Sequence, residues 1–180
     1  MASRKSRRTW VIVAVVIIAV SATVGITLSR NSTSPPELTL PIITWNETSL
    51  SELQGAPVVL NFWSISCPYC VRQLPYLENV AQQSGGQIRV VAINVANSAA
   101  QIQRFFGDYE PAMTIALDGN GEAFVGYCLA YNNSGGSIPF TLLIDSQGMV
   151  QYAKIGAFAS EAALWSTLHD VLGIATPETS

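Results

Sequence analysis

Along most of the chain, short apolar runs alternate with longer stretches in which apolar residues recur at helical spacing. Apolar runs of this kind predict buried strands, and helical spacing predicts amphipathic helices. Strands are predicted at 58–63, 89–94, 113–117, 140–144 and 150–155, with a weaker edge strand at 38–44. Helices are predicted from about 68 to 83, from 98 to 106 with Ser98 as a possible N-cap, and at 160–172, ending at Gly173.

The order of these elements predicts the fold class. Strands alternate with helices and end in a hairpin that turns at Ser146-Gln147-Gly148. This order is typical of an α/β fold with a mixed sheet and helices on both faces, although it does not single out one such fold. Residues 38–175 are long enough for one domain with a sizeable core, followed by a short tail at 176–180.

The N-terminal segment has a different pattern. Residues 1–9 carry four basic residues and no acid, and residues 10–28 contain no charged residue. An apolar run of this length approaches the roughly 20 residues that span a bilayer, and the basic flank predicts a cytoplasmic N-terminus. We expect a single-pass anchor at 10–28, a polar linker at 29–37 and a domain outside the cytoplasm. In the alternative, a signal peptide cleaved near Val20-Ser21-Ala22, the domain also lies outside the cytoplasm.

The charge distribution narrows the range of partners. Five of the nine basic residues lie in residues 1–30, and the rest of the chain has four basic against twelve acidic residues, a net charge of −8. Nucleic-acid binding usually requires a basic face, often interleaved with aromatic residues. The domain therefore offers no surface suited to nucleic acid, and the membrane is expected to be contacted through the N-terminal helix alone.

Two cysteines carry the candidate chemistry. Cys67 and Cys70 lie at the point where a buried strand gives way to a helix, with Pro68 and Tyr69 between them. The helix N-terminus stabilises a thiolate on the first cysteine and lowers its pKa, and the second lies one turn further on, within disulfide reach. Cys67 is the expected nucleophile, and Cys70 is the expected shielded thiol that resolves a mixed disulfide.

Three other interpretations of this pair compete with redox chemistry. A structural zinc site needs four ligands, and beyond the pair the chain has only Cys128 and His169, which form no second close-spaced ligand pair. A purely structural disulfide closing so short a loop would constrain the unfolded chain little. The third interpretation, coincidence, is disfavoured by the flanking residues. Redox use is therefore the favoured interpretation.

The residues around the pair carry a family resemblance. The stretch 58–70 followed by Leu74-Pro75 resembles the active-site segment of thioredoxin-like proteins, and more narrowly of the membrane-anchored TlpA/ResA type. Residues 50–57 resemble the family's segment before this strand, and residues 138–148 resemble its segment in which a proline precedes the hairpin. The resemblance covers about residues 38–172. It implies a thioredoxin-like fold and a thiol–disulfide oxidoreductase with no cofactor other than the Cys67–Cys70 disulfide.

The resemblance also implies roles for further residues. Pro139 is expected in the cis form against the disulfide, and Ile138 before it is expected to offer its backbone to an extended substrate. Trp63 is expected to be a wall of the active site. The Pro68-Tyr69 dipeptide resembles that of glutaredoxins, which hints at a potential less reducing than that of thioredoxin.

The chain departs from the family at three places. Asn61 stands where thioredoxins carry a buried acid, and Gln73 stands where ResA-type reductases carry a glutamate. An amide cannot accept the proton of Cys70, so water or another group is expected to do so and resolution is expected to be slow near neutral pH. Ser66 replaces the tryptophan usual before the first cysteine, which opens that side of the site.

Cys128 has no counterpart in the family pattern. It lies in a stretch, 126–137, that is longer than the family usually has before the proline. One interpretation is a small buried hydrophobe, the common fate of a free cysteine. The other is a third redox thiol or an intermolecular link, since an odd cysteine outside the cytoplasm is unusual.

The expected function is thiol–disulfide exchange with protein partners. The resemblance suggests a reductase, serving cytochrome c maturation and kept reduced by a membrane electron donor. The alternatives are a disulfide oxidant or isomerase, for which the direction depends on potential and partners, and a copper- or metal-binding module on the same fold.

Overall fold

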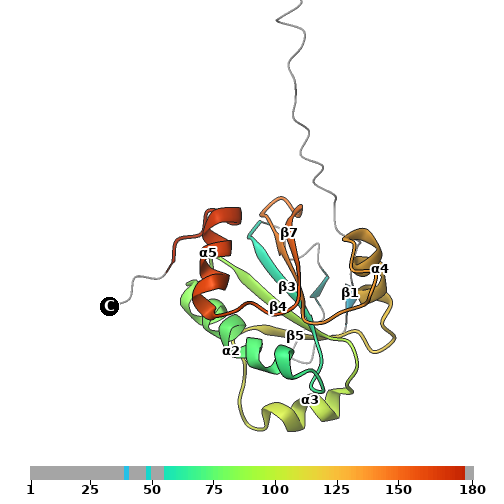
Figure 1. The fold of residues 1–180 in the computed structure, drawn as a ribbon. Coiled ribbons are helices and arrows are strands. Elements are labelled where there is room, and N and C mark those ends of the chain that lie inside the picture. Colours follow the sequence, from blue (N-terminus) through green and yellow to red (C-terminus); the bar gives the residue numbers. More distant parts are fainter. Residues whose placement is uncertain (1–38, 41–47, 50–54, 177–180) are drawn as a thin grey trace, which may run out of the picture. The chain divides into compact units, whose positions relative to one another are not determined.

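The structure is a computed structural model that describes residues 39–40, 48–49 and 55–176 (Figure 1). Within this part of the chain, two short strands form one antiparallel pair and five strands form the main sheet. The strands are β1 (Thr39–Leu40), β2 (Thr48–Ser49), β3 (Val58–Trp63), β4 (Arg89–Asn94), β5 (Thr114–Leu117), β6 (Phe140–Ile144) and β7 (Val150–Ile155). The helices are α2 (Pro68–Gln83), α3 (Ala99–Phe106), α4 (Glu122–Ala130) and α5 (Glu161–Leu172).

The main sheet is mixed, with the order β5-β4-β3-β6-β7. Strands β3, β4 and β5 run parallel, whereas β6 pairs antiparallel with both β3 and β7. All six residues of the central strand β3 are buried, as expected for a strand covered on both faces. The predicted α/β class with a mixed sheet is confirmed, and a short loop joins its central strand to the Cys67–Cys70 segment.

Each face of the sheet has its own hydrophobic core. Because side chains alternate along a strand, Val59 and Trp63 of β3 face one core, whereas Leu60 and Phe62 face the other. The first core takes its helical residues from α2, α3 and α5, and the second takes them from α4. The disulfide segment belongs to the first core, which contains Cys70.

Local sequence signals set the ends of the helices. Ser98 forms a capping box with Gln101 at the start of α3, and the Ser160 hydroxyl caps α5. Gly173 ends α5 in the left-handed conformation that glycine adopts most easily. The predicted strands and helices are confirmed to within a residue at each end, apart from the edge strand at 38–44, of which the structure describes only Thr39–Leu40.

Helix α4 is not predicted by the sequence pattern. Its apolar residues surround the helix instead of forming one stripe, and Gly126 lies within it. Its N-terminus also lacks a local side-chain cap, because Gly121 occupies the N-cap position. The carboxylate of Asp118 takes over this role by accepting hydrogen bonds from the backbone N–H groups of Ala123 and Phe124 at 3.2 and 2.8 Å.

The predicted N-terminal features lie outside the described residues. This applies to the basic tail at 1–9, the anchor at 10–28 and the linker at 29–37. None of the helices within the described ranges has both the length and the apolar character needed to cross a bilayer.

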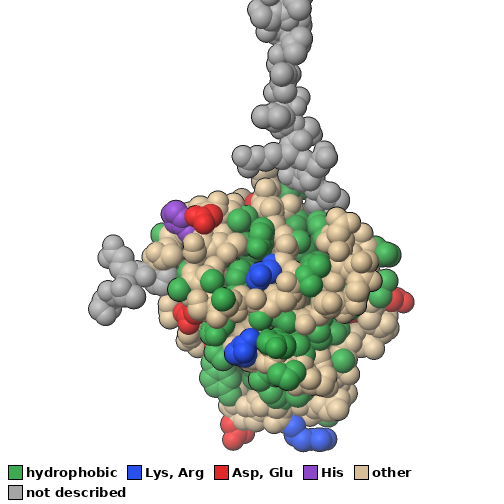
Figure 2. Space-filling model, in the orientation of Figure 1, with side chains coloured by type: hydrophobic (Ala, Val, Ile, Leu, Met, Phe, Trp, Pro, Cys, Tyr) green, Lys and Arg blue, Asp and Glu red, His purple; other side chains and the backbone are tan. Residues whose placement is uncertain are grey.

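Charge is sparse on the surface of the domain. Figure 2 shows one face, on which basic side chains stand among hydrophobic and uncharged ones while acidic side chains lie toward the rim. Among the described residues, the one ion pair joins His169 and Asp170, both exposed, at 3.3 Å. Such an exposed pair contributes little to stability, so the fold rests mainly on its two cores.

Candidate active site

Cys67 and Cys70 form a disulfide at the N-terminus of α2, with 5.2 Å between their Cα atoms. Cys67 is the N-cap residue of the helix, and its Sγ accepts a hydrogen bond from the N–H of Cys70 at 3.2 Å. Cys67 is partly exposed, whereas Cys70 is only 1% exposed. A partner sulfur can therefore approach Cys67 and not Cys70.

The start of α2 favours negative charge on Cys67. The first turn of α2 contains no acidic residue, and Pro68 occupies the first helical position. The positive end of the helix dipole and the N–H of Cys70 point toward the Cys67 sulfur, so both stabilise the thiolate that forms when the disulfide opens. The exposed first sulfur and the shielded second sulfur that the sequence predicts are both present.

The loop before Cys67 is held by an uncharged cluster of polar side chains. The hydroxyl groups of Ser64 and Ser66 lie 2.9 Å apart, and the carbonyl oxygen of the Asn97 side chain accepts from the Ser64 hydroxyl at 3.2 Å and from the Ile65 N–H at 3.0 Å. These bonds fix the path of the chain from β3 to Cys67. Asn97 is a residue that the sequence pattern does not indicate.

The Ile138–Pro139 loop lies against the disulfide. The peptide bond between these residues is cis, as the family resemblance predicts. The carbonyl oxygen of Ile138 lies 3.7 Å from Sγ of Cys67. Pro139 is in turn held by its carbonyl oxygen, which accepts from the N–H of Gly156 at 2.8 Å. The predicted substrate-binding pair, Ile138 and Pro139, thus lies at the reacting sulfur.

Asn133 shapes the approach to this loop. Its side-chain amide donates to the carbonyl oxygen of Ser137 at 2.9 Å and accepts from the N–H of Ser137 at 3.0 Å. Asn133 is 1% exposed, so these bonds are shielded from water. The long stretch before Pro139 is therefore an ordered loop, which chain length alone does not reveal.

A buried network of neutral groups lies below the disulfide. The hydroxyl oxygen of Thr141 accepts from the side-chain amides of Asn61 at 2.9 Å and of Gln73 at 3.3 Å. The carbonyl oxygen of Gln73 accepts from the backbone N–H of Phe158 at 2.8 Å. The side chains of Asn61, Gln73 and Thr141 are at most 1% exposed. The two amides singled out in the sequence therefore belong to one network, which the sequence pattern does not show because Thr141 lies 80 residues from Asn61.

None of the three side chains in this network is an acid. Gln73 lies three residues after Cys70 on the same helix, which puts the two side chains on one face of α2. An amide takes up no proton near neutral pH. The group that accepts the proton of Cys70 during exchange is therefore not a member of the network.

Trp63 lies inside the core. Its side chain is fully buried, and its ring packs on Phe105 at 5.7 Å and on Phe106 at 6.1 Å between centroids. The structure therefore places Trp63 beneath the site, where it supports the segment leading to Cys67. It offers no surface to a substrate in this conformation.

Cys128 is a free, buried thiol in the other core. It lies on α4 with Tyr127, on the face of the sheet opposite the core that contains Cys70. Burial raises the pKa of the Cys128 thiol, and a hydrogen bond with Asn133 partly opposes this effect. A thiol that is shielded and less readily ionised is poorly reactive. The structure therefore fits the first interpretation, a small buried hydrophobe.

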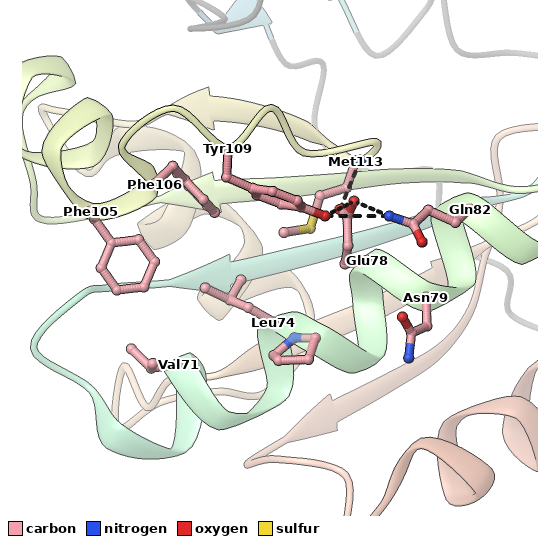
Figure 3. Close-up of a pocket in the computed structure, with 10 residues that line it drawn as sticks. Val71, Leu74, Glu78, Asn79, Gln82, Phe105, Phe106, Tyr109 and Met113 are labelled. Atoms are coloured by element: carbon pink, nitrogen blue, oxygen red, sulfur yellow. Dashed lines mark hydrogen bonds between the residues drawn. The ribbon is translucent and has the colours of Figure 1, made fainter.

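A groove of about 440 Å³ runs along α2 beside α3 (Figure 3). It begins one residue after Cys70, and its lining is mostly apolar. The lining residues are Val71, Leu74, Pro75, Glu78, Asn79, Gln82, Phe105, Phe106, Tyr109 and Met113.

The Glu78 carboxylate holds the loop between α3 and β5 against α2. It accepts hydrogen bonds from the Tyr109 hydroxyl at 2.7 Å, from the N–H of Ala112 at 2.8 Å, from the N–H of Met113 at 3.3 Å and from the Gln82 side chain at 2.8 Å. Burial acts to raise the pKa of Glu78, but these bonds outweigh it, so the pKa is lowered. The carboxylate is therefore a structural anion.

The metal-binding alternative finds no ligand set in the described part of the chain. Among these residues, no group of three or more His, Cys, Asp or Glu side chains could hold an ion. His169, the histidine considered for this role, is exposed beside Asp170 on α5.

Comparisons with known proteins agree with the geometry of this site. A family model described as Redoxin matches residues 31–170. The thiol-disulfide oxidoreductase ResA of Bacillus subtilis (strain 168) is 28% identical over 147 residues, covering 81% of this chain and 76% of that protein. The thioredoxin-like protein YneN of the same organism is 26% identical over 129 residues, covering 70% of this chain and 72% of that protein.

Solved structures show the same fold. A crystal structure of a putative thiol:disulfide interchange protein DsbE from Chlorobium tepidum has a TM-score of 0.67 and 24% sequence identity. The alignment covers 79% of this chain and 97% of that chain.

Proposed function

Because this chain belongs to the Redoxin family and is a thiol–disulfide oxidoreductase of the ResA/DsbE type, we propose that it is an extracytoplasmic reductase of protein disulfides. The observation that carries the proposal is the asymmetry of the Cys67–Cys70 pair. One sulfur is partly exposed at a helix N-terminus, and the other is 1% exposed. This arrangement suits a dithiol that donates two electrons in two ordered steps.

In the first step, the Cys67 thiolate attacks one sulfur of a partner disulfide. A mixed disulfide forms between Cys67 and the partner, and the other partner sulfur leaves as a thiolate. In the second step, the Cys70 thiolate attacks Sγ of Cys67. The Cys67–Cys70 disulfide forms, the second partner sulfur leaves as a thiolate, and the partner has gained two electrons.

The partner is held in extended form along the Ile138–Pro139 loop. The Ile138 backbone lies next to the reacting sulfur, so its N–H and C=O can pair with a partner strand as an added β-strand does. Pro139 follows Ile138 in the same loop, and this placement supports a role for both residues in substrate binding.

The proton of Cys70 leaves without the help of a buried acid. Gln73 and Asn61 are amides, so water that enters when Cys67 is bound to the partner is the proposed acceptor. Resolution is then slow near neutral pH, because water is a weak base compared with a positioned carboxylate.

The proposed location follows from the N-terminal sequence. The uncharged run at 10–28 behind a basic tail fits a signal anchor that holds the domain on the outer side of the cell membrane. Outside the cytoplasm the dithiol needs a source of electrons, for which a membrane electron donor is proposed. By family resemblance, the narrower role is reduction of cysteine pairs for cytochrome c maturation.

A redox titration of the full chain in detergent tests the direction of electron flow. The Cys67–Cys70 couple is equilibrated with glutathione and dithiothreitol buffers, with Cys128→Ser as the control for the third thiol. A reductase predicts a potential below about −250 mV, near the roughly −270 mV of thioredoxin. A potential above about −180 mV would assign an oxidant or isomerase instead, for which the Pro68-Tyr69 dipeptide is the specific observation.

A further inference from the structure

We propose that Tyr69 and Arg72 together form a receptor for a carboxylate group that a partner polypeptide carries next to its reacting cysteine. The inference rests on the proposed function, because it assumes a protein or peptide disulfide as substrate. It adds a preference among such substrates and names the residues that create it.

The position of Tyr69 makes contact with a partner unavoidable. Tyr69 lies between the two cysteines and is 61% exposed. A partner whose sulfur is joined to Cys67 must pass within a few ångströms of the residue two places further along the chain. The Tyr69 ring and hydroxyl are therefore part of the surface that every substrate meets.

Arg72 is held in place by the ring of Tyr69. The two residues are three apart on α2, which puts them on the same helix face. The guanidinium carbon lies 4.8 Å from the centre of the Tyr69 ring. Stacking of this kind orders a long side chain before the partner arrives, so less conformational entropy is lost on binding.

The stacked guanidinium keeps its hydrogen-bond donors available. Its N–H groups lie in the plane of the group and point outward, whereas the ring covers only a face. The edge of a guanidinium matches the two oxygens of a carboxylate, which it binds in a bidentate manner. The Tyr69 side chain also carries a hydroxyl group that can donate a hydrogen bond.

No carboxylate of the described chain occupies this position. Within residues 55–176 there are eight acidic and four basic residues, yet Arg72 forms no ion pair with any described acid. The first turn of α2 contains no acidic residue. The Glu78 carboxylate, further along α2, is engaged by the loop before β5. Among the described residues, an incoming carboxylate therefore meets a cation without an acidic partner, and no negative side chain on the first turn of α2 repels it.

The test uses three peptides that differ at one residue. Each contains one internal disulfide, with Glu, Gln or Lys next to the cysteine that is attacked. The reduced full chain is mixed with each peptide, and the second-order rate constant of exchange is measured. We expect the Glu peptide to react about three- to fivefold faster than the Gln peptide at low salt, the Lys peptide to react most slowly, and the difference to vanish in about 1 M salt.

Three variants test whether Tyr69 and Arg72 cause this preference. Arg72→Gln is expected to bring the ratio of the rate constants for the Glu and Gln peptides to about 1. Tyr69→Ala is expected to lower this ratio. Arg104→Gln, which removes an exposed arginine from α3 and changes the net charge equally, is expected to leave the ratio intact. A change in the acidity of Cys67 affects all three peptides alike, so the ratio is insensitive to it.

The outcomes separate the two proposals. A ratio near 1 in the parent chain, or one that Arg72→Gln leaves unchanged, would overturn the receptor while exchange with all peptides supports the proposed substrate class. Absence of exchange with every peptide would overturn the proposed function, and the receptor with it.

Discussion

Two buried polar side chains of α2, Gln73 and Glu78, lie five residues apart and have opposite electrostatic character. Gln73 is neutral, belongs to the network below the disulfide, and is fully buried. Glu78 is an anion, 7% exposed, and holds a loop. The same helix thus carries an amide at the site of electron transfer and a carboxylate away from it.

The surrounding donors and acceptors explain the difference. Glu78 receives hydrogen bonds from four donors, which compensate the loss of water around a charge. Gln73 meets one donor, the N–H of Phe158, and donates to Thr141. An amide satisfies both contacts, whereas a carboxylate would meet a single backbone donor. The carboxylate of Glu78 is therefore stable in this core because a full set of donors surrounds it, and the position of Gln73 offers no such set.

The largest effect is expected from removing the structural anion. Glu78→Ala leaves the N–H groups of Ala112 and Met113 and the Tyr109 hydroxyl without their acceptor, so the free energy of unfolding should fall by about 3 kcal/mol. Urea denaturation measures the change. Glu122→Ala, an exposed acid of α4, is the control and should cost less than about 1 kcal/mol. Equal losses for the two variants would contradict the role of Glu78.

Breaking the neutral network should have a smaller effect. Thr141→Val removes the hydroxyl that accepts from the amides of Asn61 and Gln73 while keeping the shape of the side chain. Two buried amides lose a partner, and the free energy of unfolding should fall by about 2 kcal/mol. Thr114→Val in the edge strand β5, outside the network, serves as the control. If both valine variants unfold at the same urea concentration, the hydrogen bonds to the Thr141 hydroxyl do not stabilise the fold.

Placing an acid in the network should change the chemistry and also lower the stability, because a buried carboxylate there would meet a single backbone donor. Gln73→Glu puts a carboxyl group on the helix face of Cys70, where it can accept the proton of that thiol. Release of a peptide from its mixed disulfide with Cys67 should become at least about tenfold faster at pH 7.

The control for this variant is Gln83→Glu, which adds the same charge at the exposed end of α2. It should leave the rate of release unchanged. If Gln73→Glu releases the peptide no faster than the parent chain, proton removal from Cys70 does not limit resolution.

The smallest effect is the pH dependence that Glu78 contributes. Because the pKa of Glu78 is lowered in the folded protein, its contribution to stability is fully present above the unfolded value of 4.5 and is lost as pH falls through the folded pKa. The difference in unfolding free energy between the parent chain and Glu78→Gln should be constant between about pH 6 and 8 and shrink below about pH 4.5. If the difference in unfolding free energy grows as the pH falls, the pKa of Glu78 is raised in the folded protein and not lowered.

Much of the fold is predictable from the sequence because its signals are local. The strand β3 and the helix α2 have the predicted bounds, since an apolar run and a helical pattern are separated only by the short segment that ends at Cys67. Helix α4 escapes prediction because its apolar residues form no stripe and its cap, Asp118, is supplied from before the turn.

The site was predictable only where chemistry depends on spacing along the chain. Cys67 and Cys70 are neighbours in sequence, whereas Asn61 and Thr141 meet only through the register of β3 with β6. Glu78 holds the loop between α3 and β5, and no short sequence pattern predicts the path of this loop. Trp63 is expected at the wall of the site, but the alternation of β3 turns its side chain into the core.

Trapping of a mixed disulfide tests directly whether Cys67 attacks and Cys70 is shielded. The reduced full chain with Cys70→Ser and Cys128→Ser is mixed with a peptide disulfide, and the products are identified by mass spectrometry. We expect a stable adduct of the peptide on Cys67, and almost none on Cys70 in the matching chain with Cys67→Ser and Cys128→Ser. Adducts that form equally fast on both cysteines would contradict the division into an attacking and a shielded sulfur.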